Sequence, residues 1–173
     1  MLGLKRGAVT LLPHNPEWLE EFEREKKNIL YIIGEKIIDI EHIGSTAIPN
    51  IKAKPILDLM IGIKSLDEWA ALQPHLETLK YEFRKDLREE QGHILFVKGP
   101  ENNRTHYLKV TEFGSPFWNK QLLFRDYLLN NPTYAKEYQD LKERLLKRSE
   151  NDRGTYTSGK TEFIEKILKL AEK

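Results

Sequence analysis

The chain has 173 residues and no cysteine, and its 28 basic side chains nearly balance 27 acidic ones. The lack of cysteine excludes disulfides, thiolate nucleophiles, zinc–thiolate sites and iron–sulfur clusters. The balanced charge disfavours a protein that coats a polyanion, so nucleic acid is not expected as a partner. No apolar run approaches the roughly 20 residues that span a bilayer. We therefore expect a cytoplasmic chain that does not enter a membrane.

The first part of the chain predicts one helix followed by two strands. Residues 15–17 (Asn-Pro-Glu) are typical of a helix start, and apolar residues then recur at helical spacing as far as Ile33. Residues 36–43 alternate and are rich in isoleucine, which predicts a strand. The apolar run 55–63 predicts a second and more deeply buried strand.

The rest of the chain predicts more strands and then only helices. Ser65 begins a capping-box pattern that predicts a helix start. Three further strands are predicted over 81–84, 93–98 and 104–111. Later helices are predicted to start at Ser115 and Thr133, with a loop over 151–159 before a last helix.

These elements together predict an α+β fold with a mixed sheet of about five strands flanked by helices. We expect a single domain, with an α/β core over residues 1–112 and a C-terminal helical region over 113–173.

Gly44 and Ser45 follow the first predicted strand, and Asp58 is the only charged residue of the second. A glycine lets the backbone approach a ligand closely, and the turn with Ser45 and Thr46 could cradle a phosphate. A lone carboxylate in an apolar strand needs a partner, water or a metal. Together these features have the form of the nucleotidyltransferase signature, in which Gly-Ser holds a triphosphate and paired carboxylates hold Mg²⁺.

The chain resembles the GrpB family of bacterial proteins over almost its full length. The matching segments are 41–46 (Glu-His-Ile-Gly-Ser-Thr), Lys54-Pro55 with Asp58, 124–128 (Phe-Arg-Asp-Tyr-Leu), and Tyr156 with Lys160, Phe163 and Ile164. The resemblance implies the fold of the nucleotidyltransferase superfamily. Because the family also occurs fused to dephospho-CoA kinase, it implies a role in nucleotide or coenzyme metabolism.

Two positions depart from the patterns that the resemblance implies. Met60 stands two residues after Asp58, where a working transferase usually has a second carboxylate. A thioether is a poor ligand for Mg²⁺, which prefers hard oxygen. Tyr107 and Lys109 stand where the family pattern has two histidines. They are suited to contacting an anionic ligand rather than to binding a metal.

Several other residues are candidates for the same site. His42 could contact phosphate or act as an acid or base, or it could be a structural histidine. Lys54 could neutralise a phosphate, and Lys160 could reach the site from the start of the last helix. Arg125 with Asp126 is interpreted as an ion pair that fixes a helix to the sheet, since packing residues flank it.

Residues 154–161 match the P-loop pattern G-x-x-x-x-G-K-[ST] letter for letter. A P-loop needs a strand before it and a nucleotide-binding sheet around it. A charged helical segment precedes this match instead, so we do not expect a P-loop.

Two functions from different classes follow as hypotheses. The first is a nucleotidyl- or phosphoryl-transferase, with Asp58 and His42 as catalytic residues and Asp58 holding one Mg²⁺. The second is a catalytically degenerate module that binds a nucleotide or another anion without turnover, which Met60 favours. In both, Gly44, Ser45, Thr46, Lys54, Tyr107, Lys109 and Lys160 contact the phosphate-containing ligand. A purely structural partner of another enzyme is a third alternative. The substrate and the oligomeric state stay open.

Overall fold

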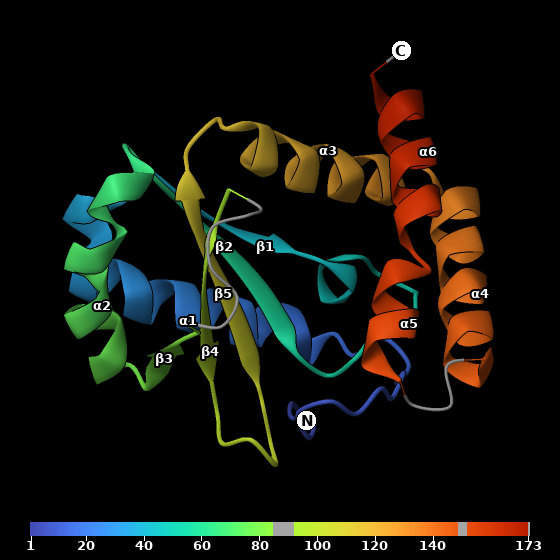
Figure 1. Cartoon of the computed structure of the whole chain (residues 1–173), viewed down its shortest axis with the longest axis horizontal. Helices are drawn as coiled ribbons and strands as arrows, with labels where there is room; N and C mark the ends of the chain where they lie inside the picture. The colour runs from blue at the N-terminus through green and yellow to red at the C-terminus, as the bar shows by residue number, and fades with distance from the viewer. Residues whose placement is uncertain (85–91, 149–151, 173) are drawn as a thin grey trace.

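The computed structural model of the protein describes residues 1–84, 92–148 and 152–172. Its centre is a five-stranded mixed sheet in the order β1-β2-β5-β4-β3 (Figure 1). The central pair β2 and β5 is parallel, and the other neighbours are antiparallel. The strands are β1 (Asp39–Ile43), β2 (Leu57–Ile63), β3 (Tyr81–Phe83), β4 (Ile94–Lys98) and β5 (His106–Glu112). The predicted α+β architecture with a five-stranded mixed sheet is confirmed.

One face of the sheet is covered by α1 (Glu17–Ile33) and α2 (Trp69–Thr78). The side chain of Asn15 accepts a hydrogen bond from the backbone N–H of Glu17 at 3.0 Å, which satisfies a free donor at the helix start. The apolar stripe of α1 packs on the side chains of alternate residues of the central strands. This interface is the main hydrophobic core.

The opposite face is partly covered by α3 (Pro116–Asn130). Ser115 caps this helix as predicted, since its hydroxyl accepts from the N–H of Trp118 at 3.2 Å. Trp118 packs with Ile43 and Met60 of the sheet. Arg125 then joins α3 to β1, because one guanidinium nitrogen lies 2.5 Å from Glu41 Oε2 and 2.9 Å from the carbonyl oxygen of His42. The predicted tether between helix and sheet is confirmed.

The last three helices stand together at one end of the sheet, on the right in Figure 1. They are α4 (Pro132–Arg148), α5 (Arg153–Ser158) and α6 (Thr161–Ala171). Ile48 and Ile51, from the connection between β1 and β2, pack into the apolar core of this helical region. The end of β1 and the C-terminal helices are therefore held in contact.

The short helical turns explain where the predicted boundaries differ. These 3₁₀ turns are η1 (Gly34–Lys36), η2 (Ser45–Ala47) and η3 (Leu66–Glu68). The first turn delays β1 to Asp39. The third delays α2 to Trp69, and the Ser65 side chain makes no capping hydrogen bond.

The predicted loop over 151–159 is wrong for most of its length. Residues 153–158 form α5, because the side chain of Asp152 accepts from the N–H groups of Gly154 and Thr155 at 3.3 and 2.8 Å. Residue 151 lies outside the described residues. The P-loop-like letters of 154–161 therefore fall in α5 and at the start of α6, rather than between a strand and a helix. None of the helices among the described residues is long and apolar enough to cross a bilayer.

Candidate functional site

Gly44 and Asp58 are in direct contact at the end of the β1–β2 pair. Gly44 has φ +70° and ψ −170°, a conformation that is essentially restricted to glycine. A Cβ atom placed on Gly44 would lie 2.8 Å from Asp58 Oδ2 and 3.1 Å from Asp58 Cβ. The glycine is therefore needed both for the turn and for the close approach of the backbone to the carboxylate.

Asp58 shares its face of the sheet with Tyr107 and Lys109. In the parallel pair, Asp58 is opposite Tyr107, and Met60 is opposite Lys109. Lys109 Nζ lies 3.5 Å from Asp58 Oδ1, and both side chains are about three-quarters buried. A carboxylate in an apolar strand needs a partner for its charge, and Lys109 is that partner for Asp58.

Ser45 links this turn to the C-terminal helices. Burial raises the pKa of Tyr138 on α4 to about 12, while a hydrogen bond with Ser45 opposes that rise. The Tyr138 ring is buried and stacks on Phe163 of α6 with 5.3 Å between ring centroids. The end of β1 and the helices α4 and α6 therefore meet at Tyr138.

Three lysines gather beside this junction, and we call Lys54, Lys142 and Lys160 the lysine cluster. The ammonium groups of Lys54 and Lys160 lie 5.5 and 4.9 Å from the centroid of the Tyr156 ring on α5. Lys142 Nζ lies 4.8 Å from the centroid of the Tyr138 ring. Such an arrangement of like charges is stabilised when an anion lies among them.

Lys142 is the most unusual member of the cluster. It is only 2% exposed, and its ammonium donates to the carbonyl oxygen of Lys52. Burial, followed by the charges of Lys160 and Lys54, lowers the pKa of Lys142 to about 7. A buried lysine with a strongly lowered pKa beside other cations is typical of functional sites.

Sequence reasoning missed Lys142, Tyr138 and Tyr156 as site residues, although one signal was present. Lys142 follows Tyr138 by four residues, which places it on the apolar face of its own helix. A lysine at such a position needs an explanation, because charged side chains are rarely fully buried.

His42 and Thr46 lie on the side of the sheet that α1 covers, so the His42 side chain does not share the sheet face of Asp58. The Asp58 carboxylate is still close enough to oppose the lowering of the His42 pKa. The His42 ring is 6% exposed and stacks on Phe22 of α1 at 4.8 Å. His42 Nε2 lies 2.9 Å from Thr46 Oγ1, and burial lowers the pKa of His42 to about 4. Alternation would have placed His42 and Gly44 on one side, but β1 ends at Ile43 and the positive φ of Gly44 turns the chain.

The residues around Asp58 do not fit a resident Mg²⁺ ion. Asp58 forms its ion pair with the ammonium of Lys109. Met60 is fully buried against α3, and Glu41 is paired with Arg125. Over the described ranges 1–84, 92–148 and 152–172, no group of three or more His, Asp or Glu side chains is arranged to hold a metal.

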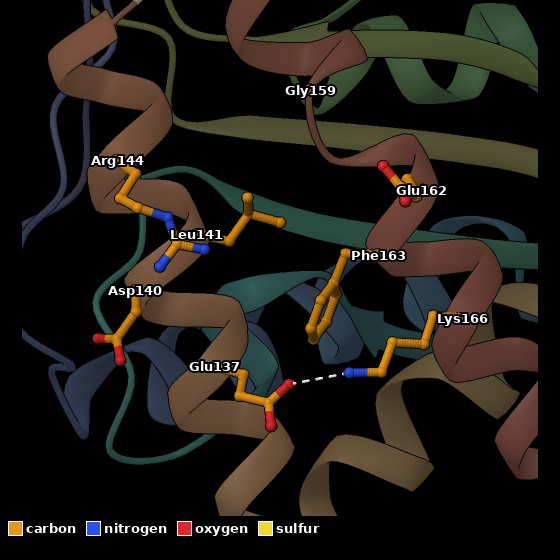
Figure 2. Close-up of a pocket in the computed structure, with 8 residues that line it drawn as sticks. All are labelled: Glu137, Asp140, Leu141, Arg144, Gly159, Glu162, Phe163 and Lys166. Carbon is orange, nitrogen blue, oxygen red and sulfur yellow. Dashed lines mark hydrogen bonds and ion pairs between the residues drawn. The ribbon is translucent and has the colours of Figure 1, made fainter.

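A cavity of about 500 Å³ lies between α4 and α6, and Phe163, which stacks on Tyr138, is among its lining residues. Figure 2 shows Leu141 and Phe163 pointing into it, with charged side chains at its edges. Lys166 and Glu137 form an ion pair of 3.1 Å across it. Phe163 therefore belongs both to the lining of this cavity and to the packing around Tyr138.

Comparison with known proteins matches residues 8–170 to the family model described as "GrpB protein". The glutamate-rich protein GrpB of Alkalihalophilus pseudofirmus is 40% identical over 173 residues, which cover 97% of this chain and 98% of that protein. The crystal structure of the conserved protein GrpB from Enterococcus faecalis has a TM-score of 0.83 and 33% identity, covering 94% of this chain and 96% of that one. A dephospho-CoA kinase of Mycobacterium leprae is 28% identical over 182 residues, which cover 89% of this chain but only 44% of the kinase.

Proposed function

Because the chain belongs to the GrpB family, we propose that it binds a phosphate-containing small molecule of the nucleotide or coenzyme type. The ligand lies where the Gly44–Ser45 turn meets the lysine cluster. Its phosphates are held by ammonium groups and by the hydroxyl of Ser45, without a resident metal ion.

The gathering of Lys54, Lys142 and Lys160 around two tyrosine rings is the observation that carries this proposal. The three residues come from the loop before β2, from α4 and from the start of α6. Lys109 adds a fourth ammonium beside Asp58, while Glu41 on the same sheet face is paired with Arg125. An excess of ammonium groups beside a Gly-Ser turn matches the charge and the donors that a phosphate requires.

The matched relatives support the nucleotide or coenzyme class. A relative of this chain is named dephospho-CoA kinase, and the match covers less than half of that enzyme. That printed name refers to a kinase of dephospho-CoA. We take this as support for the chemical class of the ligand and not for the kinase reaction.

Nucleotidyl or phosphoryl transfer is a second candidate, favoured by the contact between Gly44 and Asp58. This contact keeps a carboxylate beside the turn that would hold the phosphates. The pairing of Asp58 with Lys109 and the burial of Met60 favour binding without turnover instead. Of the two candidates, binding is the one that the geometry supports better.

A thermal-shift experiment tests the proposal with phosphate, pyrophosphate, ATP, dephospho-CoA and coenzyme A, each with and without Mg²⁺. A ligand at a hundred times its dissociation constant stabilises by about 2.7 kcal/mol, which raises Tm by roughly 5 to 10 °C in a chain of this size. We expect at least one phosphate compound to give such a shift, equally with and without Mg²⁺.

Matched lysine variants locate the ligand. Lys54→Met and Lys160→Met should each reduce the shift, whereas Lys166→Met, on the same helical region but outside the lysine cluster, should leave it unchanged. No shift with any of the five compounds would contradict phosphate binding. A shift that Lys166→Met reduces as much as Lys160→Met would contradict the location.

A further inference from the structure

The loop before β2, which carries Lys54, is held against α4 by side chains of that helix. At Lys52, the backbone N–H donates to Gln139 Oε1 at 2.8 Å, and the carbonyl oxygen accepts from the Lys142 ammonium. The Lys52 ammonium forms an ion pair of 2.9 Å with Glu143 Oε1. One residue of the loop is therefore bound through both of its backbone polar groups and through its side chain.

The loop is fixed from two sides. The three helix residues that contact Lys52 are three and four positions apart, so they share one face of α4. The next loop residue, Ala53, has a different partner. Its carbonyl oxygen accepts from the N–H of Leu12 at 2.9 Å, and its own N–H donates to the Leu12 carbonyl oxygen at 3.0 Å. The backbone is therefore held in place directly before Lys54.

Lys142 depends on this arrangement for its hydrogen bond, because the Lys52 carbonyl oxygen accepts from its ammonium. The titratable side chains around that ammonium come from the loop, from α4 and from the start of α6: Lys54, Tyr138, Glu143 and Lys160. Burial and the two lysines among them lower the pKa of Lys142, and Glu143 opposes the lowering. An acceptor stabilises an ammonium more than a neutral amine, so the Lys52 carbonyl helps to keep Lys142 charged.

Gln139 controls where that carbonyl lies, although Gln139 is uncharged and is not a member of the lysine cluster. Its side chain satisfies the N–H of Lys52 at a partly buried position. Backbone N–H groups that are removed from water need a partner, so without Gln139 this part of the loop would have to move to find one. Such a movement would separate the carbonyl of Lys52 from Lys142 and displace Lys54.

We propose that Gln139 is a positioning residue of the phosphate site, which holds the loop so that Lys142 keeps its acceptor and Lys54 stays beside Tyr156. Gln139 acts through the two lysines and does not contact the ligand. The consequence for ligand binding rests on the proposed function. The effect on Lys142 does not, because it is measured without a ligand.

Two variants of Gln139 test the positioning in the full chain. Gln139→Met keeps the length of the side chain but removes the acceptor, whereas Gln139→Glu keeps an acceptor oxygen and adds a negative charge. Both replacements are good helix formers, so α4 is retained. The titration of Lys142 is followed by ¹³C NMR of the lysine ε-carbons in the free protein, with Lys142→Met to assign the signal.

The two variants should move the titration of Lys142 in different directions. The wild-type midpoint is expected at about pH 7. Gln139→Met should lower it by roughly one pH unit, since the ammonium loses a charged hydrogen bond. In Gln139→Glu the midpoint should stay or rise, because the acceptor is kept and the added carboxylate favours the charged lysine.

Calorimetry with pyrophosphate at pH 7 measures the consequence for the phosphate site. Gln139→Met should weaken binding about three- to tenfold, because two ammonium groups lose their positions. Gln73→Met is the matched control on α2, where the exposed Gln73 side chain donates to Glu77. It should change neither the affinity nor the midpoint of Lys142.

A weaker affinity in Gln139→Met with an unmoved Lys142 midpoint would overturn the proposal, since general loosening of the fold has that effect. A lowered midpoint in both Gln139 variants would overturn it as well, and so would an unchanged midpoint and affinity in Gln139→Met. If the wild type does not bind pyrophosphate while Gln139→Met still lowers the midpoint, the proposed function fails and the positioning of Lys142 by Gln139 is supported.

Discussion

Asp58 of β2 and Lys109 of β5 are paired across two parallel strands, with 3.5 Å between the carboxylate Oδ1 and the ammonium Nζ. The sequence alone requires a partner, water or a metal for Asp58 and leaves the choice open. The structure gives it a lysine. Removing either charge of this pair by mutation should therefore change how strongly the site binds an anion.

Asp58→Asn should preserve or raise the affinity for pyrophosphate, because it removes a negative charge and leaves Lys109 available to the ligand. Lys109→Met should lower the affinity severalfold by removing the cation. Isothermal titration calorimetry without metal measures both. A metal-dependent transferase would behave in the opposite way at Asp58, losing Mg²⁺-dependent binding and turnover, and that result would favour the second candidate function.

Gly44→Ala should destabilise the protein by about 1 to 3 kcal/mol from backbone strain, with more from contact with Asp58. Urea unfolding measures the loss. Gly114→Ala is the matched control, since Gly114 also has a positive φ of +74° but an added Cβ would meet nothing within 4 Å. Equal losses in the two variants would show that the contact between Gly44 and Asp58 is unimportant.

Met60→Asp should destabilise the protein by roughly 3 to 5 kcal/mol rather than create a metal site. Met60 is fully buried beside Ile43 and Trp118, and Lys109, which lies opposite it in the register, is already paired with Asp58. A carboxylate at this position would lose its water without gaining a cation of its own. Met60→Leu, which keeps the volume, should cost less than about 1.5 kcal/mol. If Met60→Asp stayed folded and gained stability with added Mg²⁺, the assignment of Met60 to the packing under α3 would be wrong.

Lys142 should make stability depend on pH above neutrality. Its pKa is about 7 in the folded protein and near 10.5 when unfolded, so the unfolded chain binds more protons between these values. The free energy of unfolding of the wild type should therefore rise from pH 7 to pH 10, by roughly 2 to 5 kcal/mol from this residue. In Lys142→Met that contribution is absent, which urea titrations at several pH values would reveal.

The same residue should couple ligand binding to protons. A bound anion favours the charged lysine, so pyrophosphate binding at pH 8 should take up a proton, measurable by calorimetry in buffers of different ionisation enthalpy. Lys166→Met, an exposed lysine outside the cluster, should leave the uptake unchanged. Binding without proton uptake would mean that the ligand does not reach Lys142.

Among the described residues, local patterns were sufficient to predict the strands and the helices other than α5, and they indicated that Gly44 and Asp58 belong to one site. Alternation identifies the strands, and the glycine marks a turn that only glycine adopts. Because β1 and β2 are antiparallel neighbours, residues at the end of one lie beside the start of the other. These features depend on residues close in sequence, so periodicity and turn chemistry determine them.

Only the tertiary structure decided which residues complete the site. Alternation shows that Asp58 and Met60 share a face, but it does not show that α3 covers Met60 and leaves Asp58 to Lys109. The grouping of Lys142 with Lys54 and Lys160 joins segments about a hundred residues apart. Such contacts depend on how the helices pack against the sheet. Because apolar surfaces attract one another without directional preference, the spacing of residues within one segment does not determine which segments meet.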